Sequence, residues 1–171
     1  MKIVSYVTEE YQHQGERLKE CLERLKLSHN IEFIKSKGSA KANKIWKPFF
    51  LEKQFNKFPN EQLTLVDGDS YFVKRPPEII IKKDMGLVES GATKEQYWFS
   101  DAIHIHAPTQ GTKEFIRIWK SLCKYVDFIA SNNHPRILAA FYLSRKMTTY
   151  EFIDLKKTFR RNYGQHNESV Y

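Results

Sequence analysis

The sequence has few of the features that mark secreted, membrane-spanning or repeat proteins. It contains only two cysteines, Cys21 and Cys123, in 171 residues, which is too few for a disulfide framework. Each falls on the apolar stripe of an expected helix, so we predict buried, reduced thiols. No hydrophobic run reaches the roughly 18–20 residues that cross a bilayer, and the N-terminal segment does not fit a signal peptide. We therefore expect a cytoplasmic protein without a transmembrane segment.

Positive charge is what the chain has in excess. It carries 28 Lys and Arg against 20 Asp and Glu, a formal net charge of +8. Such an excess favours anionic partners, namely nucleoside diphosphates, nucleic acid or an acidic membrane surface. The basic residues concentrate in two segments, 35–47 and 156–161. With 41% hydrophobic and 14% aromatic residues, the chain is expected to form one globular domain.

The periodicity of apolar residues predicts alternating strands and helices. Strands are expected at 2–7, 31–33, 63–66, 85–88 and 98–105, and helices at 14–26, 47–58, 112–126 and from Pro135 onward. Pro48 is placed in the first turn of a helix that begins near Lys47, where proline is favoured. This alternation predicts a single-domain, three-layer α/β/α sandwich with a mostly parallel central sheet. Residues 1–146 form the expected main body, with 147–171 as a basic C-terminal extension packed on or beside it.

An acidic pair follows the most apolar of these strands. Asp67 and Asp69 come directly after Leu63–Val66, a run that suits a strand buried on both faces. Ligands of open α/β sheets bind outside the carboxyl ends of strands, which is where this pair is expected to lie. Two carboxylates with a glycine between them suit Mg²⁺ or Mn²⁺, although a surface turn can have the same composition.

The central segment resembles glycosyltransferases of the GT-A type. In that family a lysine-proline helix, here Lys47–Lys53, precedes a hydrophobic strand ending in a DXD motif, here Leu63–Phe72. Asp101–His106 is similar to the strand that follows the motif, and the resemblance extends over about residues 1–145. It implies a Rossmann-like GT-A fold and a hexosyltransferase-like enzyme. Such an enzyme moves sugar from a nucleotide-diphosphate donor to an acceptor. Mn²⁺ or Mg²⁺ would be the cofactor.

The same resemblance implies roles for residues at the expected ligand edge. Asp67 and Asp69 become metal or ribose contacts, and Tyr6 and Thr8, at the end of the first strand, are placed to contact the base. Lys47 at a helix start can combine its charge with backbone N–H groups that point at the diphosphate. Lys44 is a second candidate for that role, and both lysines also fit an exposed helix face.

Three further positions are candidates from the later part of the chain. Asn133 and His134 stand where relatives often carry an acidic residue that engages the donor sugar or the acceptor, so the stereochemical outcome stays open. Asp101 and His134 are the candidates for the general base of an inverting reaction. His166 is the candidate for a C-terminal histidine that completes the metal shell in some relatives. A flexible tail is the alternative for this position.

Two histidines lie two positions apart on an expected strand. His104 and His106 therefore point to the same side of the sheet. A zinc site needs further ligands, and no third one lies in obvious register. We expect these two side chains to line a cleft or to lie at the surface.

Two other functions stay open on the sequence alone. One is a nucleic-acid-binding protein without catalysis, although helix-turn-helix, zinc and ribonucleoprotein patterns are absent. The other is a metal-dependent nuclease or phosphatase built on Asp67 and Asp69. Such sites usually use three or more carboxylates, for which Glu89 and Asp101 are the candidates.

The charge of the C-terminal segment bears on the acceptor. It predicts a polyanionic acceptor, either an acidic glycan or DNA as in DNA-modifying transferases, that lies beside the donor site. A solvated terminal helix is the alternative. The basic residues concerned are Lys156, Lys157, Arg160 and Arg161.

Overall fold

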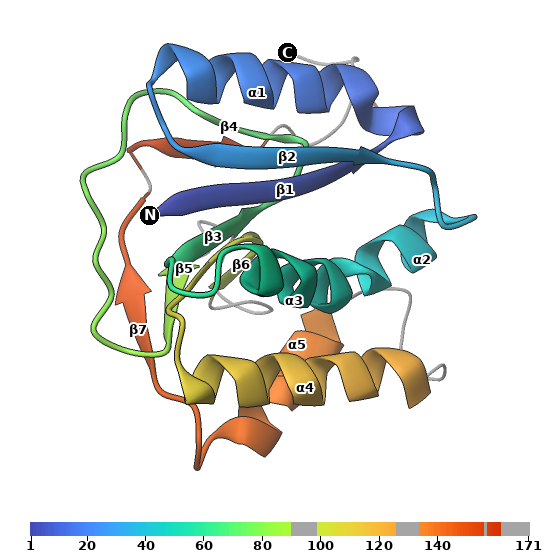
Figure 1. Cartoon of the computed structure of the whole chain (residues 1–171), viewed down its shortest axis with the longest axis vertical. Coiled ribbons are helices and arrows are strands. Elements are labelled where there is room, and N and C mark those ends of the chain that lie inside the picture. Colours follow the sequence, from blue (N-terminus) through green and yellow to red (C-terminus); the bar gives the residue numbers. More distant parts are fainter. Residues whose placement is uncertain (90–98, 126–133, 156, 162–171) are drawn as a thin grey trace.

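The computed structural model describes residues 1–89, 99–125, 134–155 and 157–161 (Figure 1). Its strands are β1 (Lys2–Thr8), β2 (His29–Ile34), β3 (Leu63–Val66), β4 (Ser70–Phe72), β5 (Met85–Glu89), β6 (Phe99–His106), β7 (Tyr150–Ile153) and β8 (Phe159–Arg161). Its helices are the 3₁₀-helix η1 (Glu9–Tyr11) and the α-helices α1 (Gln12–Arg24), α2 (Ala40–Ile45), α3 (Lys47–Lys57), α4 (Gln110–Tyr125) and α5 (His134–Ser144). Within these residues, no helix has the length and apolar character needed to span a membrane.

The central sheet has six strands in the order β2-β1-β3-β6-β5-β7. Strand β1 pairs in parallel with both β2 and β3, and β5 pairs in parallel with β7. Strand β6 is antiparallel to both of its neighbours, β3 and β5. Five of the six strands therefore run in one direction, which confirms the predicted mostly parallel sheet.

Helices cover both faces of this sheet and make three layers (Figure 1). Adjacent residues of β1 divide between the two cores, with Val4 facing one side and Ile3 the other. The Val4 side packs against the aromatic side chains of α3 and α4, and against α5. The Ile3 side packs against Leu18 and Leu22 of α1 and against Phe72 of β4. The predicted three-layer α/β/α sandwich is confirmed.

The start of α3 follows from its sequence. Pro48 lies in the first turn, where its missing N–H leaves no helical bond unmade, as predicted. The preceding residues form the short helix α2, whose N-terminus is capped by Ser39, which accepts a hydrogen bond from the Ala42 N–H at 3.1 Å. Trp46 ends α2 and precedes α3, so Lys47 is the first residue of a helix.

The C-terminal segment contributes two strands that apolar periodicity did not predict. Strand β7 completes the central sheet, and β8 pairs with β4 to form a separate two-stranded ribbon. The signal in β7 is weak, since it has four residues and leaves Tyr150 and Phe152 about half exposed. The division into 1–146 and 147–171 stays a prediction.

The two histidines of β6 lie in the core, so their predicted place at a cleft or at the surface is wrong. His104 and His106 are 1% and 0% exposed. The ring of His104 lies 6.1 Å from that of Trp119, and the ring of His106 lies 6.3 Å from that of Phe115. The two side chains share a face, as the alternation predicts, but that face is the one covered by α4.

Burial of His106 gives the fold a pH dependence. Desolvation, with a smaller effect of neighbouring His104, lowers the pKa of His106 well below the ordinary 6.5. The unfolded chain therefore binds a proton at this position more readily than the folded chain does. We expect the free energy of unfolding to be insensitive to this group above about pH 6.5 and to fall as the pH drops below it.

The replacement His106→Leu should reduce the dependence of the free energy of unfolding on pH below about pH 6.5, measured by urea unfolding between pH 5 and 7.5. The exposed His13 supplies the control, because His13→Leu should leave the slope of the parent protein unchanged. An unchanged slope in His106→Leu would contradict the assignment.

Candidate functional site

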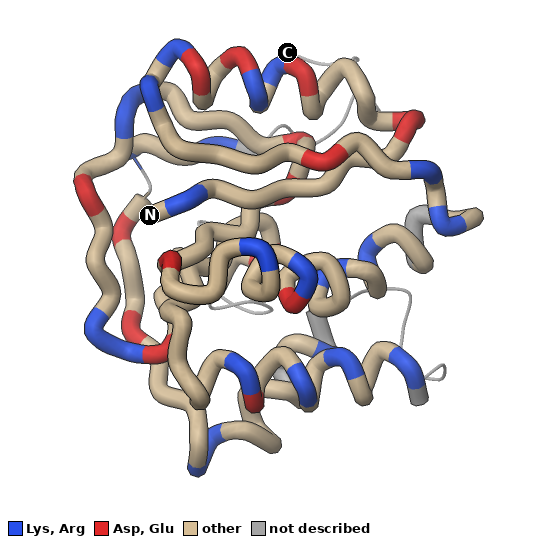
Figure 2. Tube along the Cα trace, in the orientation of Figure 1, with Lys and Arg blue, Asp and Glu red and all other residues tan. Residues whose placement is uncertain are grey.

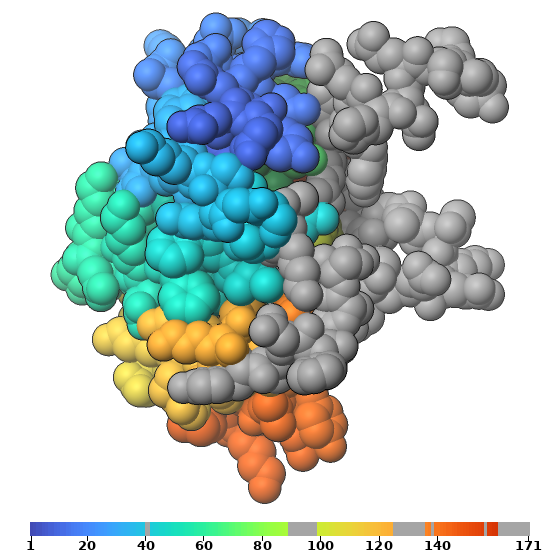
Figure 3. All heavy atoms as spheres, turned by 90° about the vertical axis from the view of Figure 1, so that its right-hand side faces the viewer, coloured from blue at the N-terminus to red at the C-terminus, as the bar shows by residue number. Residues whose placement is uncertain are grey.

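Parallel strands bring their carboxyl ends to one edge of the sheet. Thr8 at the end of β1 is in register with Ile34 at the end of β2. Strand β3 ends at Val66, just past the pair of Val4 and Leu65, and the turn after it brings Gly68 against Val7 near the end of β1. The antiparallel β6 begins at this edge, so Asp101 comes next to Asp67. Figure 3 views the molecule from this side, toward which the arrowheads of β1 and β2 point in Figure 1. Two predicted site residues, Asp67 and Asp101, thus meet at the expected edge.

A buried ion pair holds Asp67 in place. Its Oδ1 lies 2.6 Å from the Nζ of Lys47, and the two side chains are only 16% and 6% exposed. The same Nζ donates to the carbonyl oxygen of Asp101 at 2.9 Å, while the Asp67 N–H donates to the carbonyl of Ala102 at 2.9 Å. The first residue of α3 is therefore tied to the end of β3 and the start of β6.

Gly68 is required by close packing against β1. A Cβ at this position would lie 2.7 Å from Cγ2 of Val7, a separation that side chains do not tolerate. The turn is closed by the Ser70 N–H, which donates to the Asp67 carbonyl at 3.1 Å. The acidic pair is thus pressed against the end of β1, which is where the sequence places it.

Asp69 faces a different neighbour from Asp67. It lines a small hollow of about 10 Å³ together with Ser70 and Tyr71 and with two residues of α1, Gln14 and Arg17. Asp67 is thereby directed to α3 and Asp69 to the α1 side. Arg17, which the sequence patterns did not single out, lines the same hollow as Asp69.

Tyr6 joins β1 to α2. Its hydroxyl donates to the Asn43 carbonyl at 2.6 Å, and its ring packs 5.0 Å from that of Phe50. Burial, reinforced by the negative charge of Asp67, raises the pKa of Tyr6 well above 10. The phenol is therefore neutral at physiological pH and acts as a hydrogen-bond donor. Its predicted contact with the nucleobase of the donor stays a prediction.

Glu10 is a carboxylate at this edge that sequence patterns did not single out. Hydrogen bonds from the Thr8 side chain, from its own backbone and from the Ser36 side chain lower its pKa. Thr8 itself is buried, and Glu10 is exposed. The signal that would have found it is the Thr-Glu-Glu sequence at the end of a strand, where a hydroxyl readily bonds a carboxylate two residues on.

The other predicted site residues are placed only in part. Lys44 lies exposed in the last turn of α2. His134 begins α5, but its side chain, like Asn133 and His166 as a whole, lies outside the described residues. Their roles stay predictions.

The two carboxylates of this turn are of the chemical type that hard divalent ions prefer, although Asp67 is turned to Lys47 and Asp69 to the α1 side. Carboxylate oxygens are the ligands that Mg²⁺ and Mn²⁺ prefer, and Asp67 and Asp69 supply them from a turn fixed on both sides. Among the residues that the structure describes, no group of three or more His, Cys, Asp or Glu comes together. Two protein ligands with other positions left to phosphate oxygens and water suit such an ion, whereas a closed structural metal site needs more.

The contact between Gly68 and Val7 can be tested directly. We expect Gly68→Ala to cost about 1–3 kcal/mol of unfolding free energy, because the new methyl group overlaps Val7. The double variant Val7→Ala/Gly68→Ala removes the clash, so its loss should be smaller than the sum of the two single losses. Chemical denaturation of the four proteins measures both quantities. Strict additivity would show that the contact does not constrain the turn.

Comparisons with known proteins identify the fold. No protein-family model and no curated protein matches the chain. The chain is similar to the structure of a glycosyltransferase involved in glycosylation of the major capsid of PBCV-1, with a TM-score of 0.70 and 16% identity over 90% of this chain and 80% of that one. It is also similar to two structures of the glycosyltransferase GlyE from Streptococcus pneumoniae TIGR4, with TM-scores of 0.56 and 0.54 and 12% and 13% identity. These matches cover 88% and 89% of this chain but only 44% of GlyE. The chain therefore has the mixed α/β fold of these glycosyltransferases.

Proposed function

We propose that the chain is a metal-dependent glycosyltransferase of the GT-A type, which uses a nucleotide-diphosphate sugar as donor. One observation carries the proposal: Asp67-Gly68-Asp69 is fixed at the carboxyl end of β3 in a fold shared with glycosyltransferases. Carboxyl ends of strands are the ligand edge of such sheets. In this proposal, Asp67 and Asp69, with the buried Lys47 ammonium beside Asp67, correspond to a DXD motif.

The proposed roles follow from the charges at the edge. Asp67 and Asp69 would hold Mn²⁺ or Mg²⁺ together with the diphosphate. The ion would supply positive charge that stabilises the negative charge developing on the leaving phosphate. One of the two carboxylates is already balanced by Lys47. Among Asp67, Lys47 and Asp69 alone, a bound dication would leave one net positive charge, which suits an anionic diphosphate.

Lys47 acts on Asp67 in this proposal. Its ammonium lies 2.6 Å from the carboxylate and is almost fully buried, so it fixes the orientation of Asp67 before any donor arrives. An ammonium has three donors, and two of them are directed to Asp67 and to the Asp101 carbonyl. We retain a contact of Lys47 with the diphosphate as the alternative, and the two roles differ in how Lys47 and Asp67 couple.

The general base is the least determined role. Asp101 lies at the start of β6 beside the acidic pair, which supports it as the candidate for an inverting reaction. His134 remains the second candidate, from the start of α5.

The rival function, a nuclease or phosphatase that uses two metal ions, has less support. Within the described ranges, no third metal-ligating side chain joins Asp67 and Asp69 in a cluster.

The first test is titration calorimetry with a panel of nucleoside diphosphates in Mn²⁺ and in excess chelator. We expect binding that requires the metal and that Asp69→Asn abolishes, because the amide removes one anionic ligand. Glu20→Gln is the matched control, since Glu20 is an exposed carboxylate on α1. Equal affinity in chelator would exclude the metal role, and equal affinity in Asp69→Asn would exclude this residue as a ligand.

A second test separates the two roles of Lys47. We expect Lys47→Met to cost about 3–5 kcal/mol of unfolding free energy, because it leaves the largely buried Asp67 carboxylate without its partner. Diphosphate binding should weaken by about tenfold or more, and nucleoside binding should weaken less. Lys44→Met is the control, because Lys44 is exposed.

The single variant Asp67→Asn and the double variant Lys47→Met/Asp67→Asn complete a double-mutant cycle. If Lys47 positions Asp67, the double variant regains much of the lost stability, and the two changes are strongly non-additive in diphosphate affinity. Additive losses of affinity would instead assign Lys47 a direct phosphate contact. Equal weakening of diphosphate and nucleoside would leave Lys47 with a structural role only.

A further inference from the structure

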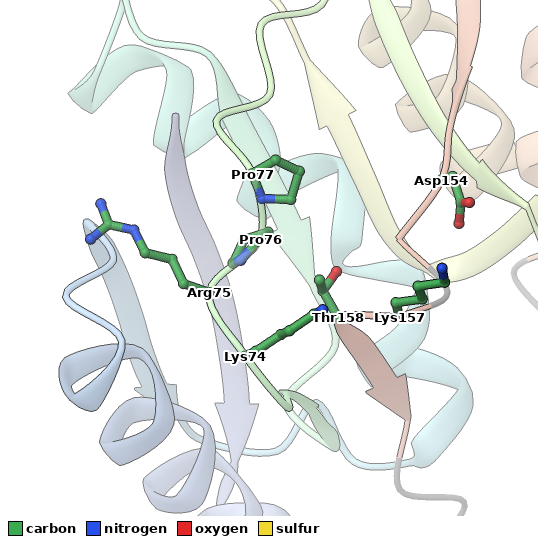
Figure 4. A pocket seen from close by; sticks show the side chains of 7 residues that line it. All are labelled: Lys74, Arg75, Pro76, Pro77, Asp154, Lys157 and Thr158. Atoms are coloured by element: carbon green, nitrogen blue, oxygen red, sulfur yellow. The ribbon is translucent and has the colours of Figure 1, made fainter.

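A surface hollow lies where two distant basic segments meet. Its volume is about 540 Å³, and its walls come from Lys74, Arg75, Pro76 and Pro77 on one side and from Asp154, Lys157 and Thr158 on the other. The Val73 N–H donates to the Thr158 carbonyl at 2.9 Å, which holds the two walls together. Figure 4 shows Lys74 extending toward Thr158 and Lys157 toward Asp154, with both proline rings on the opposite wall.

The lining is chemically suited to an anionic sugar chain. Lys74 and Lys157 extend into the region of the hollow, whereas the side chain of Arg75 points away from it at the rim (Figure 4). Against the single carboxylate of Asp154, these lysines give the lining an excess of positive charge. None of the three, Lys74, Arg75 and Lys157, forms a salt bridge within the part of the chain that the structure describes, so their charges remain available to a ligand. Proline rings offer a rigid apolar wall, and Thr158 and Asp154 offer groups that bond hydroxyls. Apolar walls with a few convergent polar groups are typical of binding sites for small molecules.

The hollow is connected to the acidic edge by the ribbon of β4 and β8. Ser70, which follows Asp69 directly, is in register with Arg161, and Tyr71 is in register with Arg160. From Ser70 the ribbon runs four residues to Lys74, a distance of about 13 Å at strand spacing. Arg160 is exposed along this path. Figure 2 shows basic positions on the chain in this part of the molecule as well as on α1 and α4.

We propose that this hollow binds an anionic oligosaccharide, with the chain of the acceptor lying along the β4–β8 ribbon toward Asp69. The assignment as acceptor rests on the proposed glycosyltransferase function, whereas the binding of the anionic sugar chain does not. It gives the basic residues near the C-terminus a function in the choice of acceptor. Lys74 and Lys157 recognise its negative groups, while the acidic edge holds the donor.

A sugar chain fits the hollow better than nucleic acid does. None of the described residues that line it is aromatic, whereas proteins that bind single strands use aromatic rings on which bases stack. The carboxylate of Asp154 also lies in the lining, where it would repel a closely following phosphate backbone. A sugar chain with charges spaced along it can place hydroxyls at Asp154 and negative groups at the lysines.

The test measures binding of three probes by titration calorimetry at several salt concentrations. The probes are a hyaluronan hexasaccharide, which carries a carboxylate on every second ring, a neutral chitin hexasaccharide and a single-stranded DNA dodecamer. We expect hyaluronan to bind more tightly than the neutral chain, with an affinity that falls as salt rises. The double variant Lys74→Ala/Lys157→Ala should lose about tenfold or more in affinity for hyaluronan.

Two matched variants control this experiment. Lys113→Ala/Lys146→Ala removes the same charge from exposed positions on α4 and after α5, and it should bind hyaluronan as the parent does. Lys74→Arg/Lys157→Arg keeps the charge and should retain most of the binding. The proposal is overturned if hyaluronan does not bind, if both hexasaccharides bind equally, or if both double alanine variants lose the same affinity. Tighter binding of DNA with the same dependence on Lys74 and Lys157 would assign the hollow to nucleic acid instead.

The proposed function and this inference fail separately. Diphosphate titrations on the Lys74→Ala/Lys157→Ala protein should match those of the parent, because the hollow lies away from the acidic edge. Diphosphate binding without hyaluronan binding would reject the hollow alone. Hyaluronan binding without metal-dependent diphosphate binding would keep the hollow as a glycan site and reject the transferase function.

Discussion

The ion pair between Lys47 and Asp67 is the interaction on which the arrangement of the ligand edge depends. It joins the first residue of α3 to the turn that follows β3. The Lys47 ammonium also donates a hydrogen bond to the Asp101 carbonyl of β6. A pair buried to this extent is costly to break from one side, since the remaining charge would lie in a poorly solvated place. The edge is therefore set by electrostatics from one side of the sheet and by the contact of Gly68 with Val7 from the other.

This arrangement explains why so much of the edge could be predicted from sequence. Leu63–Val66 is largely apolar and buried at every position, because β3 is covered on both faces, and this burial ends where the acidic pair begins. Pro48 marks the start of α3, since proline is tolerated in a first turn and not in a helix interior. These are local signals. The partner of Lys47 is not local: the lysine was placed at a helix start, and its contact with Asp67 depends on the packing of α3 against β3.

Tertiary context also decided the features that periodicity missed. The alternation of His104 and His106 showed that they share a face, but it could not show that α4 covers that face with Phe115 and Trp119. Strand β7 was missed because it is short and half exposed. Likewise, residues 74–77 lie between the expected elements, and Asp154, Lys157 and Thr158 fall in the expected basic extension. Their meeting depends on the pairing of β4 with β8, which no local pattern encodes.

The position of β7 has a consequence for synthesis of the chain. This strand pairs in parallel with β5, and Met85 is in register with Tyr150, a partner about 65 residues further along. At ribosomal rates of roughly 5–20 residues per second, β5 leaves the ribosome about 3–13 s before its neighbour exists. Throughout that interval one side of β5 has unpaired backbone groups, which is the kind of edge that recruits other chains. A nascent chain stalled before Tyr150 would therefore be a target for chaperones and a source of aggregates.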